Sequence, residues 1–236
     1  MSADLPATLA RLEAWLVEHA PGIHATLRPG APDVELDALE SATGLKLPEA
    51  FRTLYRWHDG QDQRNYVGGV FGLSFLPLER VSGEWHVWAE IGGDPEWEDL
   101  NEDMAAVSVS HPTGAIQAAY TTPGWLGFLA DGGSNSVGLD FNPGPAGTAG
   151  QVITFGRDEE EKYVLADSLD DFLREYLHRL ETGRVTVQAL AGYSHEMWSI
   201  QLHDASGQGY GTSWSTSADL YPGFGAAPER PRRKRR

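Results

Sequence analysis

The stretch from Trp125 to Leu173 constrains the fold of this 236-residue chain more than any other. Short runs rich in β-forming residues alternate there with turns rich in glycine or charge, a pattern typical of consecutive strands. The turn Asp131-Gly132-Gly133 supplies glycines that can take positive φ, and the link NPGPAGTAG contains too much glycine and proline for regular structure. We therefore predict a central meander. Its strands are predicted at Trp125–Leu129, Ser136–Phe141, Gln151–Phe155 and Tyr163–Ala166.

Helices are predicted on both sides of the meander, because apolar residues recur there at helical spacing. In the first helix, leucines fall at i, i+4, i+7 and i+11; Gly44 ends the second, and Ser168 caps the last. The predicted helices are Leu5 to about His19, Asp33 to Gly44, Glu49 to about Trp57, a fourth through Leu78, Val81, Trp85 and Trp88, and Ser168 to about Leu180.

The remaining segments carry weaker patterns. One or two strands are predicted in Tyr66–Leu76, and single strands at Ala106–Val109 and Ile116–Tyr120. Periodicity fades from Gly92 to Ala106, which predicts an ordered or semi-ordered loop. After Gly183, VTVQAL and MWSIQLHD predict an added hairpin.

Helices, then strands, then a helix indicate an α+β fold with an antiparallel or mixed sheet. We divide the chain into a main domain (1–182), a hairpin extension packed on it (183–228) and a basic flexible tail (229–236). The first twenty residues do not resemble a signal peptide, and no run is long and apolar enough to span a bilayer. A soluble cytoplasmic protein is the expectation.

Charge narrows the choice of partners. Six of the 18 basic residues fall within 230–236, so residues 1–228 hold 12 basic and 33 acidic groups, a net charge of 12 − 33 = −21. Such a surface repels nucleic acid and favours a partner with a basic surface. The basic tail is interpreted as a solvated arm rather than a nucleic-acid site. The sequence leaves the oligomeric state open.

No pattern of catalytic or metal-binding residues emerges. The chain has no cysteine, and its eight histidines are scattered without H-E-x-x-H spacing, so neither a zinc site nor a cofactor is predicted. Asp131 and Asp140 flank the DGGSN turn closely enough for a carboxylate pair, but each also suits a turn or strand end, and we favour the structural interpretation. A hydrolase using Asp131, Asp140 and His58 is the alternative to a non-enzymatic protein.

The strongest physical indication of a partner is the stretch 84–103, which holds eight acids and no Lys or Arg. Trp85 and Trp88 suit the core side of a helix. Trp97 lies in an acidic context, where an indole usually packs against something or meets a partner. A binding role for this stretch competes with a merely solvated face.

Several ordered motifs resemble the Smi/Knr-type cell-wall assembly regulator family of the SUKH superfamily. The similarity covers about residues 8–180 and is carried by LPEAFRTLYRWHDGQ (Leu47–Gln61) and DGGSN…LDFNPGP…GQVI (Asp131–Ile153). The resemblance implies a twisted, mainly antiparallel sheet flanked by helices. It also implies a non-enzymatic module that binds another protein.

The same resemblance places partner contacts near a cleft by the central sheet. The candidate residues are Trp57, His58, Asp59, Gln61, Trp97, Asp131, Asn135 and Asp140, where Trp97 comes from the acidic stretch rather than from the family motifs. Two functions stay open. The first is a regulatory or scaffolding module, and the second is an immunity protein that neutralises a basic, nuclease-type toxin, as the resemblance to bacterial relatives implies.

Overall fold

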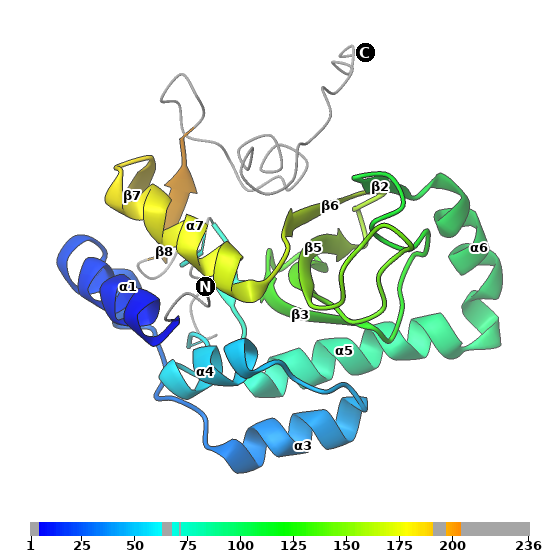
Figure 1. Ribbon diagram of the computed structural model, residues 1–236, viewed down its shortest axis with the longest axis horizontal. Coiled ribbons are helices and arrows are strands. Elements are labelled where there is room, and N and C mark those ends of the chain that lie inside the picture. The colour runs from blue at the N-terminus through cyan, green and yellow to red at the C-terminus, as the bar shows by residue number, and fades with distance from the viewer. Residues whose placement is uncertain (1–4, 63–67, 71, 191–196, 204–236) are drawn as a thin grey trace.

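A computed structural model describes residues 5–62, 68–70, 72–190 and 197–203 (Figure 1). Helices α1, α4 and α7 lie together at one end of the molecule, and α3 lies beside α5. The sheet occupies the centre, and α6 lies at the opposite end beyond α5. The helices are α1 (Leu5–His19), α2 (Pro21–His24), α3 (Asp33–Thr43), α4 (Glu49–Trp57), α5 (Leu78–Gly93), the 3₁₀ helix η1 (Pro95–Trp97), α6 (Glu98–Val107) and α7 (Leu169–Glu181).

Six strands form the main sheet in the order β1-β3-β4-β5-β6-β2. All neighbours are antiparallel except β2, which pairs with β6 in parallel. The strands are β1 (Ser74–Phe75), β3 (Trp125–Ala130), β4 (Asn135–Asp140), β5 (Gln151–Gly156), β6 (Glu161–Ala166) and β2 (Val109–His111). The predicted α+β fold with a mainly antiparallel sheet is confirmed.

The central strands are buried on both faces. One side packs against the helices in the main core cluster, as Val152 does, whereas its neighbour Ile153 belongs to a second, smaller cluster. Ala115 and Ile116, from the chain before β3, cover that second face. Because successive side chains in a strand point to opposite faces, burial of both faces explains why β4 and β5 are buried at every position.

The strongly patterned predictions are confirmed. The four strands of the meander lie within two residues of their predicted bounds. Ser168 caps α7, its hydroxyl accepting a hydrogen bond from the backbone of Asp171 at 3.2 Å. Gly44 ends α3 with φ of 71°, in the left-handed region that glycine adopts without strain.

Three predictions are wrong. Gly92–Ala106 is not a loop, because α5 continues to Gly93 and is followed by η1 and α6. The predicted strand Ala106–Val109 is replaced by the end of α6 and by β2. Ile116–Tyr120 forms bends, and its residues Ile116 and Ala119 pack on the second face of the sheet, so they reflect burial rather than strand pairing. Of the strands predicted in Tyr66–Leu76, β1 is described; positions 66, 67 and 71 lie outside the described residues.

The predicted C-terminal hairpin is present as β7 (Val185–Leu190) and β8 (Met197–Leu202). Ile200 and Leu202 are buried in the main core cluster, and the backbone of Ile200 donates to Gly68 O at 2.9 Å. Described residues end at His203, so the predicted extent of the extension to 228 and the basic tail 229–236 lie outside them.

Candidate functional site

His58 and Asp59 follow α4 at a corner where distant segments meet. The His58 ring contacts Arg28 O through Nδ1 at 2.6 Å and Glu13 Oε2 through Nε2 at 2.9 Å. Asp59 is 5% exposed, accepts a hydrogen bond from the first residue of α5, Leu78, at 2.8 Å, and pairs with Arg28 at 3.0 Å. Burial raises the pKa of Asp59, although this hydrogen bond and Arg28 oppose the rise. Both side chains therefore join segments of the fold.

Gln61 makes a similar clamp and is 1% exposed. Its amide nitrogen donates to Thr26 Oγ1 and its amide oxygen accepts from the backbone of Phe75, both at 2.9 Å. It thereby fastens the chain after α2 to strand β1. In this conformation little of Gln61 is available to a partner, and its proposed role in binding stays a prediction.

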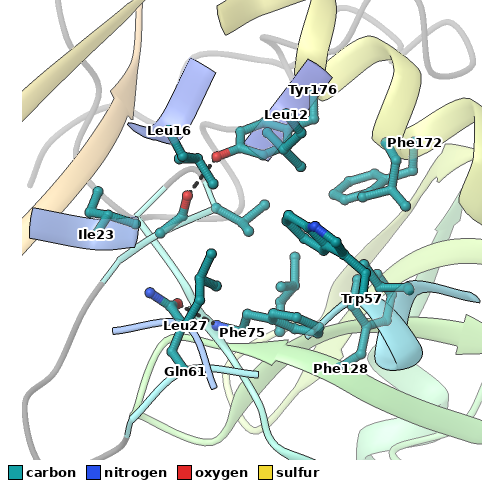
Figure 2. Close-up of a pocket in the computed structure, with 15 residues that line it drawn as sticks. Leu12, Leu16, Ile23, Leu27, Trp57, Gln61, Phe75, Phe128, Phe172 and Tyr176 are labelled. Carbon is teal, nitrogen blue, oxygen red and sulfur yellow. Dashed lines mark hydrogen bonds between the residues drawn. The ribbon is translucent and has the colours of Figure 1, made fainter. Parts of the chain in front are cut away.

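Trp57 lines an apolar cavity of about 30 Å³ inside the core (Figure 2). Side chains from α1, α2, α4, α7 and the sheet converge on it, among them Leu16, Phe128 and Phe172. Tyr176 closes one side by donating to Gly69 O at 2.6 Å. A cavity of this size holds about one water-sized molecule. It is therefore a packing void rather than a ligand site.

Asp131 and Asn135 build the turn between β3 and β4. Asp131 Oδ1 accepts from the backbones of Gly133 at 2.6 Å and Asn135 at 3.1 Å, as in an Asx turn. Asn135 continues the network, its Oδ1 accepting from the backbone of Asp158 at 2.9 Å. Ser134 takes positive φ (74°) to close the turn.

Asp140 lies at the other end of β4 and is fully buried. It accepts from Gln151 Nε2 at 2.9 Å and from the backbone of Asn142 at 3.0 Å. Burial raises its pKa, with these two hydrogen bonds opposing the rise. A six-residue strand is about 17 Å long, so Asp131 and Asp140 do not form a carboxylate pair. Within the described residues, no three His, Asp or Glu side chains are placed to hold a metal ion.

Trp97 lies in a different region, between α5 and α6. Trp97 is 42% exposed, and no residue of η1 or α6 is buried. Leu100, on the first turn of α6, is 37% exposed. Asn101 holds α6 against α5 by donating to Ile91 O at 2.7 Å. The segment is thus a fixed pair of helices with an exposed aromatic residue.

Acidic residues surround Trp97, and among the described residues these acids have no ion-pair partner. Between Arg80 and Arg157 the sequence contains no Lys or Arg. Glu84 pairs with Arg80, but across the described part of the chain no ion pair reaches the seven acids that follow. We call these seven, with Trp97 and Leu100, the α5–α6 acidic surface. The acids are Glu90, Asp94, Glu96, Glu98, Asp99, Glu102 and Asp103.

A second group of acids is paired instead. Arg52 lies 2.6 Å from Asp37 and Arg56 lies 2.7 Å from Asp33. The hydrogen bond from Arg56 lowers the pKa of Asp33. We call this group the α3–α4 acidic surface. Its acids, each within ion-pair distance of Arg52 or Arg56, are Asp33, Asp37, Glu40 and Glu49.

The sequence-predicted residues thus fall into four separate places. Trp57, His58, Asp59 and Gln61 share the corner after α4, Asp131 and Asn135 share a turn, and Asp140 and Trp97 stand apart. Sequence reasoning missed Glu13 and Arg28, which support the corner from 30 to 45 residues away. It also missed the α6 helix. For the α5–α6 acidic surface, the available signal in the sequence was the absence of Lys and Arg from 81 to 156.

Among the described helices, none combines the length and apolar content that crossing a membrane requires.

Comparison with known proteins places these observations in a family. Residues 30–175 match the SMI1 / KNR4 family (SUKH-1). The chain is 33% identical over 214 residues to the "Cell wall biosynthesis/cell cycle regulator smi1" of Schizosaccharomyces pombe, covering 84% of this chain and 42% of that protein. It is 27% identical over 199 residues to the "Cell wall assembly regulator SMI1" of Saccharomyces cerevisiae, covering 73% and 39%.

A third relative, "KNR4/SMI1 homolog 2" of Debaryomyces hansenii, is 31% identical over 209 residues, covering 75% of this chain and 35% of that protein. The chain therefore spans less than half the length of each of these relatives. The family match covers more than half of this chain and includes α3, α4, the whole main sheet and the first half of α7. The chain belongs to the SMI1 / KNR4 family (SUKH-1).

Proposed function

We propose that this chain is a non-enzymatic, regulatory protein-binding module that acts in the cytoplasm and receives a basic partner on the α5–α6 acidic surface. The observation that carries the proposal is that the seven acids around exposed Trp97 have no ion-pair partner among the described residues. Two relatives are named as regulators, which supports the regulatory part.

The physical support is a contrast in how the candidate side chains are used. Asp59, Asp131 and Asp140 accept hydrogen bonds from other groups of the fold. The carboxylates around Trp97 are instead exposed beside a large apolar ring. Interfaces favour such an arrangement, because aromatic residues supply the buried contact and unlike charges select the partner.

The test is affinity capture by the full chain and by two charge-reversed variants. Glu102→Lys/Asp103→Lys alters the proposed surface. Glu18→Lys/Glu35→Lys makes the same change in net charge at exposed sites on α1 and α3. We expect an identified protein with a basic surface to be captured by wild type and the α1/α3 control, and lost from the α6 variant. Equal capture by all three proteins, or no partner above background, would overturn the proposal.

A second candidate function is neutralisation of a basic, nuclease-type toxin. The same seven acids favour it, because a surface of one sign speeds association with a nuclease that carries the opposite charge. The check is co-expression with toxin genes that neighbour this one. Rescue of growth by wild type and the α1/α3 control, but not by the α6 variant, supports immunity. If wild type rescues growth from none of the neighbouring toxins, the immunity function is excluded.

A further inference from the structure

The α5–α6 acidic surface is an unpartnered helix face with a defined chemistry. It combines two exposed apolar side chains, Trp97 and Leu100, with seven carboxylates that have no ion-pair partner among the described residues. A matching ligand would therefore carry aromatic or apolar residues next to a run of positive charge.

The chain itself contains such a segment. Residues 220–236 read LYPGFGAAPERPRRKRR, in which Tyr221 and Phe224 precede six basic residues. Elsewhere, 12 basic residues are spread over the remaining 219 positions, and Arg28, Arg52 and Arg56 are already bound to acids. The segment 220–236 thus concentrates six of the chain's 18 basic residues next to two aromatic residues.

The segment is also long enough to reach the surface. Described residues end at His203, on the hairpin end of the molecule, while α6 lies at the opposite end (Figure 1). A globular domain of about 200 residues has a radius of gyration of about 16 Å, which corresponds to a diameter of about 45 Å. The link of about 18 residues from His203 to Tyr221 can extend to roughly 60 Å, which exceeds that diameter. Such a tether raises the local concentration of the segment to about the millimolar range.

We propose that residues 220–236 dock in cis on the α5–α6 acidic surface, with Tyr221 and Phe224 against Trp97 and Leu100 and the basic run along the carboxylates. The segment then competes with an external basic partner, so that binding of a partner must displace it. The inference rests on the proposed function for the choice of surface, but the experiment that tests it measures docking directly and needs no external partner.

The experiment uses the full chain, which has no cysteine, with one cysteine introduced as Ala227→Cys and carrying a nitroxide spin label. Paramagnetic broadening of backbone amides is measured at about 0.01 M ionic strength, where the Debye length is about 30 Å, and at about 1 M, where it is about 3 Å. We expect strong loss of intensity at residues 94–107 in low salt and its recovery in high salt. The α3–α4 acidic surface should stay sharp in both.

Two variants fix the interpretation, and the amide spectrum of each reports that it is folded. Glu102→Lys/Asp103→Lys should abolish the broadening, and Glu18→Lys/Glu35→Lys should retain it. Equal broadening at 94–107 in a mixture of spin-labelled chains without isotopes and isotope-labelled chains without the spin label would assign the docking to a second copy and overturn docking in cis. Absence of broadening at 94–107 in low salt would also overturn it. If such a chain still captures a partner that depends on α6, the proposed function stands without the inference.

Discussion

The two acidic surfaces of this protein differ in what their carboxylates do. On the α3–α4 surface, Arg52 and Arg56 hold four acids and thereby fasten one helix to the next. On the α5–α6 surface, a similar density of acids has no cation within the described structure. Similar composition therefore serves two purposes in this interpretation: the first surface stabilises the fold, and the second is the surface that we propose for binding.

The corner after α4 contains a buried acid, Asp59, that is paired like the acids of the α3–α4 acidic surface. We expect Asp59→Ala to cause the largest loss of stability, about 2–4 kcal/mol, because it leaves the Arg28 guanidinium and the Leu78 amide without their buried acceptor. Asp59→Asn should cost less, since its amide oxygen can still accept from Leu78. Denaturant unfolding measures both. Unchanged stability of the Ala variant would show that the corner does not fasten the fold.

The pairing of Glu13 with His24 and His58 can be tested by the dependence of stability on pH. Burial raises its pKa, but hydrogen bonds from His24 and His58 outweigh that effect and lower the pKa below 4.5. A carboxyl with a lowered pKa in the folded state stabilises it above pH 4.5, and this contribution disappears as the pH falls through the folded-state pKa. Glu13→Gln should therefore cost about 1 kcal/mol at neutral pH, given its partial exposure. Its unfolding curve should converge with that of wild type in acid. A cost independent of pH would contradict the ionic role.

On the α3–α4 surface itself, Arg52→Gln removes the guanidinium shared by three acids. We expect the Tm to fall by roughly 2–4 °C, because the acids repel one another without it. The fall should be smaller in about 1 M salt, where the repulsion is screened. Arg52→Lys is the control, which keeps the charge and should lose less. A Tm that does not change would place the two acidic surfaces in the same class.

The smallest effect on stability is expected on the α5–α6 surface. Glu102→Lys/Asp103→Lys breaks no ion pair among the described contacts, so the Tm should change by about 1 °C or less, as is usual for surface substitutions. Thermal unfolding beside the Arg52→Gln variant makes the comparison direct. A fall as large as that of Arg52→Gln would show that these acids stabilise the fold and would remove the argument that they are held for a ligand.

Strong local patterns made most of the fold predictable from sequence. The buried face of α7 and the meander follow from spacing, capping and turn residues that lie close together in the chain. Helix α6 was missed because none of its residues is buried, so it lacks the apolar periodicity by which a helix is predicted. The segment 116–120 was taken for a strand because a buried covering loop needs the same apolar residues as a strand does.

The candidate site was less predictable, for a reason of distance along the chain. The sequence shows that His58, Asp59 and Gln61 are polar residues beside a helix end. It does not show that Glu13, Arg28 and Thr26 lie beside them in the folded chain and bind them. The sequence shows that Trp97 is an indole among acids, but whether those acids are paired depends on tertiary contacts. The roles of all eight candidate residues in binding a partner stay predictions.

The most direct test of the central claim is to map where a plain cationic probe binds. The full chain is prepared with the six basic residues of 230–236 changed to Gln, so that its own segment does not compete. A hexa-arginine peptide is then titrated while backbone amide shifts are followed. The account predicts salt-sensitive shifts at residues 90–103 and little change at 33–49. Equal or larger shifts at 33–49 would show that pairing with Arg52 and Arg56 does not decide which acids are available, and would contradict the account.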